Sequence, residues 1–151
     1  MITRRDVVVA VVAVCVAITA VVLAETVVAP VMKSSVFTWD SLKAEAKPTG
    51  ARRGVFDSRT ATLDRFECHI TTINPGKMPH EGHHHPEEEL IIVREGTIEA
   101  VQNSATNNVG PGGVIFEASN EYHSLRNMGQ TPATYYVIKW FPPGMAKTKA
   151  D

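Results

Sequence analysis

The stretch His80–Leu90, HEGHHHPEEEL, contains four histidines and four glutamates within eleven residues. It is either a solvated loop of biased composition or part of a metal site. In an extended chain, residues two apart point to the same face. His83, His85 and Glu89 then share one face, and His84 points away from it. Two imidazoles and a carboxylate on one face can bind a metal ion and leave coordination positions open. The other ionisable residues of the stretch are expected to be solvated: His80, Glu81, Glu87 and Glu88.

A further histidine lies far downstream. The segment GGVIFEASNEYHSLRN contains His123, and no histidine stands between it and His85. His123 follows turn-forming residues and begins a predicted strand. In an antiparallel barrel, strands that are distant in sequence lie side by side. We therefore expect His123 to reach the first cluster as a fourth metal ligand.

The rest of the chain predicts short strands separated by turns. Residues 63–74, LDRFECHITTIN, alternate apolar and polar side chains with the period of a strand. Residues 89–102 predict two strands paired as a hairpin around Glu95-Gly96, and residues 103–113 predict a turn cluster. Three more strands follow in VIFEA, YHSLRN and ATYYVIKWF. This pattern predicts an all-β fold, a small antiparallel barrel or sandwich over residues 60–142.

Both histidine stretches resemble the two motifs of the cupin superfamily. His83, His85, Glu89 and Gly96 have the first spacing, H-x-H-x3-E-x6-G, although Gly76 precedes His83 by one residue more than the motif expects. The second motif has the form G-x5-P-x-G-x2-H-x3-N. Its matching residues here are Gly112, His123 and Asn127, whereas Ala118 replaces the proline and Asn120 replaces the glycine. Asparagine tolerates a left-handed backbone, so we expect the turn before His123 to be kept.

The resemblance implies a single-domain cupin, a jelly-roll-like double-stranded β-helix with one divalent metal ion inside. The implied ligands are His83, His85, Glu89 and His123. Mn or Fe is favoured, and Zn, Ni and Cu are alternatives. One implied function is a metal-dependent enzyme that acts on a small oxygenated molecule as a dioxygenase, isomerase, lyase or hydrolase. The alternative is a non-catalytic domain that binds a metal or a small ligand. A homodimer is compatible with either function.

The sequence identifies no catalytic acid or base. Seven polar residues on predicted strands are expected at the surface or rim, and His69 is the best candidate among them to line the barrel mouth. These residues are Glu67, His69, Arg94, Tyr122, Arg126, Tyr136 and Lys139. Phe116, Trp140 and Phe141 are expected in the core. Cys68 is expected to be a lone buried thiol.

The ends of the chain differ in composition from the body. Residues 1–29 combine Arg4 and Arg5 with the apolar run from Val7 to Ala24, which predicts an export signal similar to a twin-arginine signal, or a membrane anchor. The domain would then be periplasmic, extracellular or membrane-anchored. Residues 30–59 are expected to be an extended arm and residues 143–151 a tail. The net charge of -1 argues against a nucleic-acid partner.

Overall fold

The structure is a computed structural model that describes residues 30–145. The predicted export segment, residues 1–29, and the last residues of the expected tail, 146–151, lie outside the described residues. Between residues 30 and 145, no helix has the length and apolar character needed to cross a membrane.

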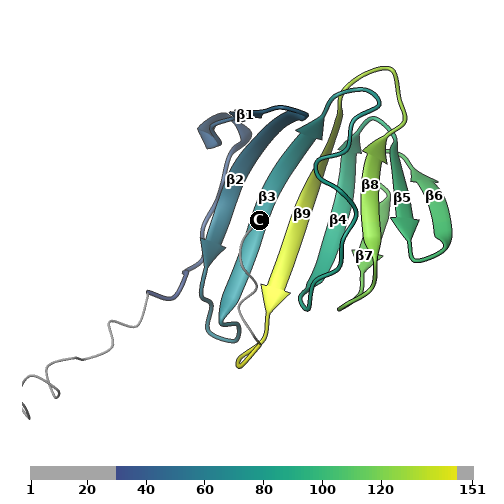
Figure 1. Ribbon diagram of the computed structural model, residues 1–151. Helices are drawn as coiled ribbons and strands as arrows, with labels where there is room; N and C mark the ends of the chain where they lie inside the picture. The colour runs from purple at the N-terminus through teal and green to yellow at the C-terminus, as the bar shows by residue number, and fades with distance from the viewer. Residues whose placement is uncertain (1–29, 146–151) are drawn as a thin grey trace, which may run out of the picture.

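The described residues form nine strands and one short 3₁₀ helix (Figure 1). In chain order these are η1 (Trp39–Ser41), β1 (Glu45–Lys47), β2 (Gly50–Ser58), β3 (Arg65–Ile73), β4 (Glu88–Glu95), β5 (Ile98–Gln102), β6 (Ala105–Val109), β7 (Val114–Glu117), β8 (His123–Asn127) and β9 (Ala133–Phe141). A six-stranded sheet has the order β1-β2-β3-β9-β4-β7, and a three-stranded sheet has the order β6-β5-β8. The pairings between these strands are antiparallel, which confirms the predicted all-β, jelly-roll-like fold.

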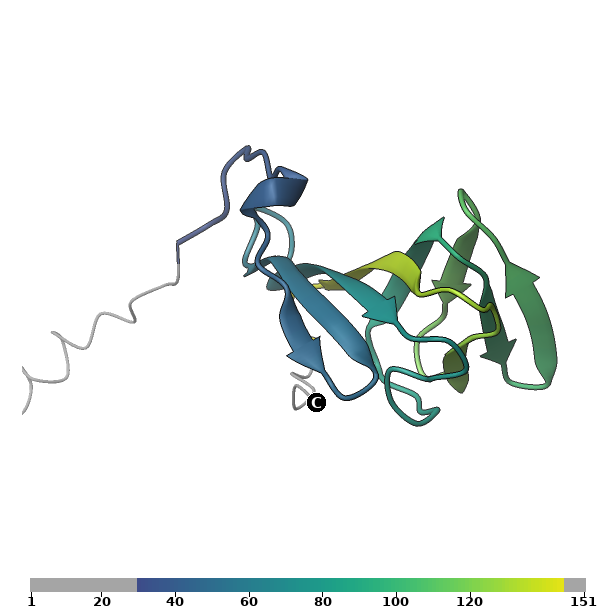
Figure 2. The ribbon, with the colours of Figure 1, turned by 90° about the horizontal axis from the view of Figure 1, so that it is seen from above.

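The hydrophobic core lies between the two sheets, which face each other in Figure 2. Ile91 and Val93 of β4 alternate with exposed or half-buried neighbours, and Ile98 and Ala100 of β5 meet them from the other sheet. Tyr135 of β9 is also almost fully buried. Burying one aliphatic side chain such as Ile91 stabilises the fold by about 1.5–3 kcal/mol. A shift of the strand by one residue would expose all of these side chains, so the alternation of apolar residues determines which face of the strand lies inward.

The predicted hairpin around Glu95-Gly96 is wrong. β4 pairs with β7 and β9, whereas β5 pairs with β6 and β8. Gly96 is instead the corner where the chain leaves one sheet for the other. Its φ of 80° and the 2.6 Å between a Cβ built there and the Cβ of Ala133 both require glycine. A local pattern marks a turn, but it does not specify which strand becomes the partner.

The turn cluster predicted over residues 103–113 is also partly wrong, because it contains β6. The tight turn of the β5–β6 hairpin includes Asn103, whose φ is 51°. β6 was missed because its residues, ATNNV, are mostly polar and exposed. An edge strand of this kind buries too little apolar surface to show a strand pattern.

Residues 30–59, expected to be an extended arm, contain η1 and also supply β1 and β2 to the six-stranded sheet. Phe37 packs against Phe56 with ring centroids 5.6 Å apart. The Trp39 ring lies 3.8 Å from the guanidinium carbon of Arg94 and 4.8 Å from that of Arg53. Phe37 and Trp39 therefore cover part of the six-stranded sheet.

The expected core aromatics divide into two groups. Phe141 is buried, as predicted, whereas Phe116 is 47% exposed. Phe116 stacks on the half-buried Trp140 with centroids 6.3 Å apart. The prediction for Phe116 is wrong because β7 is an edge strand, and Phe116 alternates with the inward-facing Ile115 and Glu117.

Candidate metal centre

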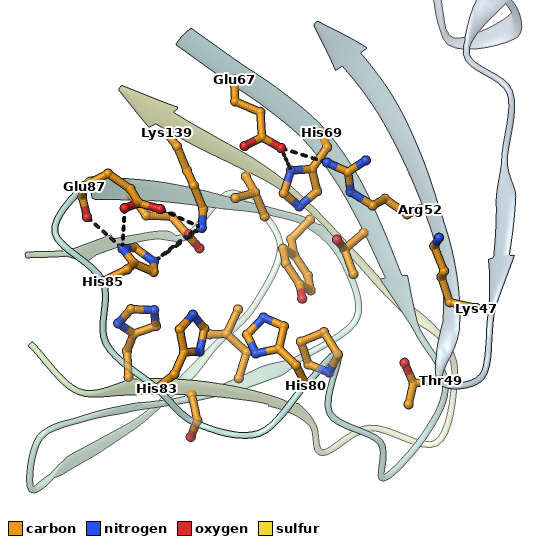
Figure 3. A pocket seen from close by; sticks show the side chains of 18 of the residues that line it. Lys47, Thr49, Arg52, Glu67, His69, His80, His83, His85, Glu87 and Lys139 are labelled. Atoms are coloured by element: carbon orange, nitrogen blue, oxygen red, sulfur yellow. Dashed lines mark hydrogen bonds and ion pairs between the residues drawn. The ribbon is translucent and has the colours of Figure 1, made fainter. Parts of the chain in front are cut away.

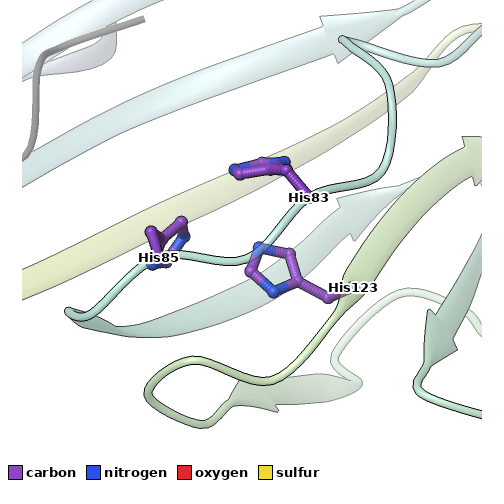
Figure 4. A group of neighbouring side chains, drawn as sticks. All are labelled: His83, His85 and His123. Carbon is purple, nitrogen blue, oxygen red and sulfur yellow. The ribbon is translucent and has the colours of Figure 1, made fainter.

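Three histidines meet inside the barrel, and we call His83, His85 and His123 the histidine cluster (Figure 4). One ring nitrogen from each lies within 4.8 Å of those of the other two. His83 and His85 lie on the extended segment before β4, and His123 is the first residue of β8. Two backbone hydrogen bonds join His83 to His123: the amide of His83 donates to the carbonyl of His123 at 3.0 Å, and the reverse bond is 2.9 Å. The expected meeting of the two histidine stretches is confirmed.

The turn before His123 depends on a left-handed residue. Asn120 has a φ of 59°, the conformation expected where the cupin motif has glycine. Its backbone amide donates to the carbonyl of His85 at 2.8 Å. This turn is therefore hydrogen-bonded directly to a residue of the histidine cluster.

Each imidazole of the histidine cluster is oriented by a backbone carbonyl. In His83, Nδ1 lies 3.3 Å from the carbonyl oxygen of Glu81. In His85, Nδ1 lies 2.8 Å from the carbonyl oxygen of Glu87, and in His123 it lies 3.0 Å from that of Glu121. A carbonyl can only accept a hydrogen bond, so Nδ1 carries the proton in all three rings. Nε2 of each neutral ring then keeps its lone pair, which is the arrangement that metal-ligating histidines adopt.

The electrostatics favour neutral rings for His83 and His123 but not for His85. Burial lowers the pKa of His83 and of His123, and the positive charge of nearby histidines lowers both further. Burial also lowers the pKa of His85, but its contacts with Glu89 and Glu87 outweigh this and raise the pKa above its ordinary value. Nε2 of His123 is buried and has no hydrogen-bond partner among the described residues. An unsatisfied buried nitrogen costs about 1–3 kcal/mol. A bound metal ion would satisfy this lone pair, so the donor set fits the divalent ion that the sequence implies.

Glu89 lies beside the histidine cluster. Its Oε2 is 3.4 Å from Nε2 of His85 and 2.9 Å from Nζ of Lys139. Burial works against ionisation of this carboxyl group, but the contacts with His85 and Lys139 outweigh it and lower the pKa to about 2. Glu89 is thus an anionic oxygen donor next to the three nitrogen donors, although it is not one of the group of mutually close ligand atoms.

Lys139 and Glu87 are also part of this centre, although both were expected elsewhere. Lys139 was expected at the surface or rim, yet Nζ lies 3.3 Å from Nε2 of His85 and 3.5 Å from Oε1 of Glu87. Glu87 was expected to be solvated and is 4% exposed. The odd-numbered positions 83, 85, 87 and 89 share one face, so alternation alone could have placed Glu87 inside. His84 and His80 are exposed, as predicted.

The histidine cluster opens into a pocket with a volume of about 860 Å³ (Figure 3). Its opposite side, which we call the second wall, consists of Arg52 from β2 and of Glu67 and His69 from β3. Oε1 of Glu67 accepts hydrogen bonds from Arg52 at 2.7 Å and from His69 Nδ1 at 3.1 Å. His69 therefore lines the pocket, as predicted. Glu67 was expected at the surface, but it is 8% exposed.

Comparisons with known proteins agree with this fold. Residues 69–139 match the family model described as the cupin domain. An RmlC-like cupin from Shewanella frigidimarina NCIMB 400 is 12% identical, with a TM-score of 0.60, over 74% of this chain and 95% of that one. The polyketide cyclase RemF from Streptomyces resistomycificus is 23% identical, with a TM-score of 0.59, over 80% of this chain and 88% of that one. KdgF from Halomonas sp. is 11% identical, with a TM-score of 0.58, over 76% of this chain and 100% of that one.

No curated protein matches the chain significantly. At these identities, the similar structures establish the fold alone. Together with the cupin domain match, they support the cupin superfamily.

Proposed function

We propose that this protein binds one divalent metal ion through His83, His85, His123 and Glu89 and acts as an enzyme on a small oxygenated molecule. The observation that carries the proposal is the common orientation of the three imidazoles. Each Nδ1 donates to a carbonyl, so Nε2 of each neutral ring keeps its lone pair for a metal. Nε2 of His85 lies 3.3 Å from Nζ of Lys139, and Nε2 of His123 is buried with no other partner among the described residues.

The ligand chemistry limits the choice of metal. Three neutral imidazoles and one carboxylate suit Mn or Fe, which we favour, and also Zn, Ni and Cu. When bound, such an ion supplies Lewis-acid chemistry to an oxygen of the substrate or, for a redox metal, oxygen chemistry. His83, His85, His123 and Glu89 would hold the ion, which would then be able to bind oxygen atoms of a substrate.

The pocket supports an enzyme over a domain that only binds metal. A volume of about 860 Å³ is within the range of small-molecule sites, about 300–1,000 Å³. The second wall places polar groups inside the pocket, whereas a mouth closed by apolar side chains would favour simple binding. A polyketide cyclase shares the fold, so this fold is compatible with catalysis on a small molecule.

We further propose that the protein is exported. The support is the sequence of residues 1–29, in which a basic pair precedes a long apolar run. Cell fractionation of the full-length chain tests this: we expect the protein in the periplasm, the medium or the membrane. Full-length protein in the cytoplasm would contradict export without affecting the metal proposal.

The decisive experiment is the metal content of protein purified without a histidine tag, measured by elemental analysis. We expect close to one equivalent of a first-row metal per chain in the parent protein and almost none in His83→Ala or His85→Ala. His84→Ala is the matched control, because His84 is exposed and outside the histidine cluster. Full occupancy in His83→Ala, or loss in His84→Ala, would contradict the ligand assignment. Turnover of a panel of diketones, catechols and sugars then separates an enzyme from a binding domain.

A further inference from the structure

His69 has a different environment from the residues of the histidine cluster. Its Nδ1 lies 3.1 Å from a carboxylate oxygen of Glu67 rather than from a backbone carbonyl. The same carboxylate is also contacted by Arg52 at 2.7 Å and by Arg65 at 3.2 Å. Glu67 is 8% exposed, so three side chains hold this buried carboxylate in one orientation.

These contacts determine which nitrogen of His69 carries the proton. The hydrogen bond from His69, followed by the charges of His69, Arg65 and Arg52, lowers the pKa of Glu67 despite its burial. Glu67 is therefore ionised near neutral pH and can only accept a hydrogen bond, so Nδ1 of His69 is the donor. Nε2 of the neutral ring is left as a proton acceptor, and His69 itself lines the pocket.

The strand register relates the second wall to Glu89, which lies beside the histidine cluster. β3 pairs with β9, and β9 pairs with β4, so Glu67, Lys139 and Glu89 lie opposite one another on three adjacent strands. Two interstrand spacings separate β3 from β4, which is about 10 Å. His69 lies two residues from Glu67 on the same face of β3, on the other side of the pocket from His83 and His85 (Figure 3). A small molecule can lie between the two walls.

We propose that His69, positioned by Glu67, is the residue that accepts and returns a proton on a substrate bound between the second wall and the histidine cluster. This inference rests on the proposed function, and it names the substrate class as α-hydroxy carbonyl compounds. A metal ion held by the histidine cluster would attract the two adjacent oxygens of such a compound, and a carbon next to a carbonyl carries a removable proton.

The proposed step is a balanced proton transfer. The C–H bond next to the carbonyl breaks, and its proton goes to Nε2 of His69. The electron pair of that bond forms a carbon–carbon double bond, and the carbonyl π electrons move to the carbonyl oxygen. Return of the proton from Nε2 restores the molecule, with no oxidant or reductant needed. In heavy water the returned nucleus is deuterium.

The competing explanation is purely structural. Arg52 lies on β2 and Glu67 on β3, so their ion pair also joins two strands. A structural role requires the charge of Glu67 but not a particular proton position on His69. The ring tautomer and the proton exchange of a bound molecule therefore distinguish the two roles.

The first measurement is the nitrogen-15 NMR spectrum of the histidine side chains in the full-length, zinc-loaded protein, with assignment of His69 by its absence from His69→Gln. We expect the parent protein to show His69 protonated at Nδ1 and unprotonated at Nε2. In Glu67→Gln the ring should become a mixture of both tautomers. A parent ring protonated at Nε2, or an unchanged tautomer in Glu67→Gln, would overturn the positioning role of Glu67.

The second measurement follows hydroxyacetone in heavy water by proton NMR, with the same zinc-loaded proteins at equal metal content. We expect the parent protein to catalyse exchange of the protons next to the carbonyl. The exchange rate should fall at least about 100-fold in His69→Gln and at least about 10-fold in Glu67→Gln. Arg126→Gln, which changes an exposed side chain that does not line the pocket, is the control and should keep the parent rate. Circular dichroism verifies that each variant is folded.

The outcomes separate this inference from the proposed function. A parent protein that binds no metal would overturn both. A metal-loaded parent with no exchange above the metal-free protein, or a folded His69→Gln that exchanges at the parent rate, would overturn the role of His69 and leave the metal site intact.

Discussion

The two sides of the pocket orient their imidazoles in different ways. In the histidine cluster, neutral backbone carbonyls accept from Nδ1 of His83, His85 and His123. On the second wall, the carboxylate of Glu67 accepts from Nδ1 of His69. Both arrangements leave the lone pair of Nε2 in the neutral ring, but a carboxylate partner stabilises a protonated imidazolium far more than a carbonyl does. The same residue type is thus suited to metal binding on one wall and to proton transfer on the other.

The largest expected effect that tests this comparison comes from His123→Ala. Changing the hydrogen-bond partner of a metal ligand costs about 10–100-fold in affinity, so removing the ligand itself should cost more than about 100-fold. Metal titration followed by calorimetry measures the affinity. A chelator should lower the melting temperature of the parent protein, because only the folded barrel binds the metal. It should have much less effect on His123→Ala, and equal sensitivity in the two proteins would remove His123 from the site.

Glu89→Gln should have a smaller effect on the same measurement. Glu89 is already paired with Lys139 at 2.9 Å, so a metal ion must compete with that ammonium for the carboxylate. We expect a loss in metal affinity of about 10-fold. Unchanged affinity would show that the three imidazoles are the only protein ligands and that Glu89 forms the ion pair with Lys139 without binding the metal.

Glu67→Gln should leave metal affinity unchanged and should reduce stability. Removing a buried, hydrogen-bonded charge while Arg52 and His69 remain should cost about 1–3 kcal/mol at pH 7. Because the pKa of Glu67 is lower in the folded state than the ordinary 4.5, its contribution is complete above that value and is lost as the pH falls through the folded pKa. The difference in free energy of unfolding between parent and variant should shrink below about pH 4.5. A difference that is constant with pH would contradict this origin.

The smallest effect concerns Cys68, which lies between Glu67 and His69 and faces the other side of β3. Cys68 is 7% exposed, and burial raises the pKa of its thiol to about 11. In a Cys15→Ser variant, a thiol-specific disulfide reagent at pH 8 should react with the folded protein at least about 100-fold more slowly than with the unfolded chain. Rapid reaction of the folded protein would show that the Cys68 face of β3, and not the face with Glu67 and His69, is open to the pocket.

The sequence by itself determined the elements whose pattern is local. Alternation identified β3 and β9, and motif spacing selected His83, His85 and His123 and the left-handed Asn120. The strands were predicted correctly because side-chain direction in an extended chain has a period of two, whatever the strand pairs with. The three histidines lie together as expected, and metal binding by them stays a prediction.

The tertiary structure decided what depends on partners. It made Gly96 a corner between sheets rather than a hairpin turn, and it left Phe116 exposed on an edge strand. It also brought Lys139 of β9 between Glu67 of β3 and Glu89 of β4, and so placed two residues expected at the surface or rim, Glu67 and Lys139, in one pocket with the predicted ligand Glu89. No local pattern contains this information, because the order of strands in a sheet is set by the packing of the whole core, and that order fixes which charges become neighbours.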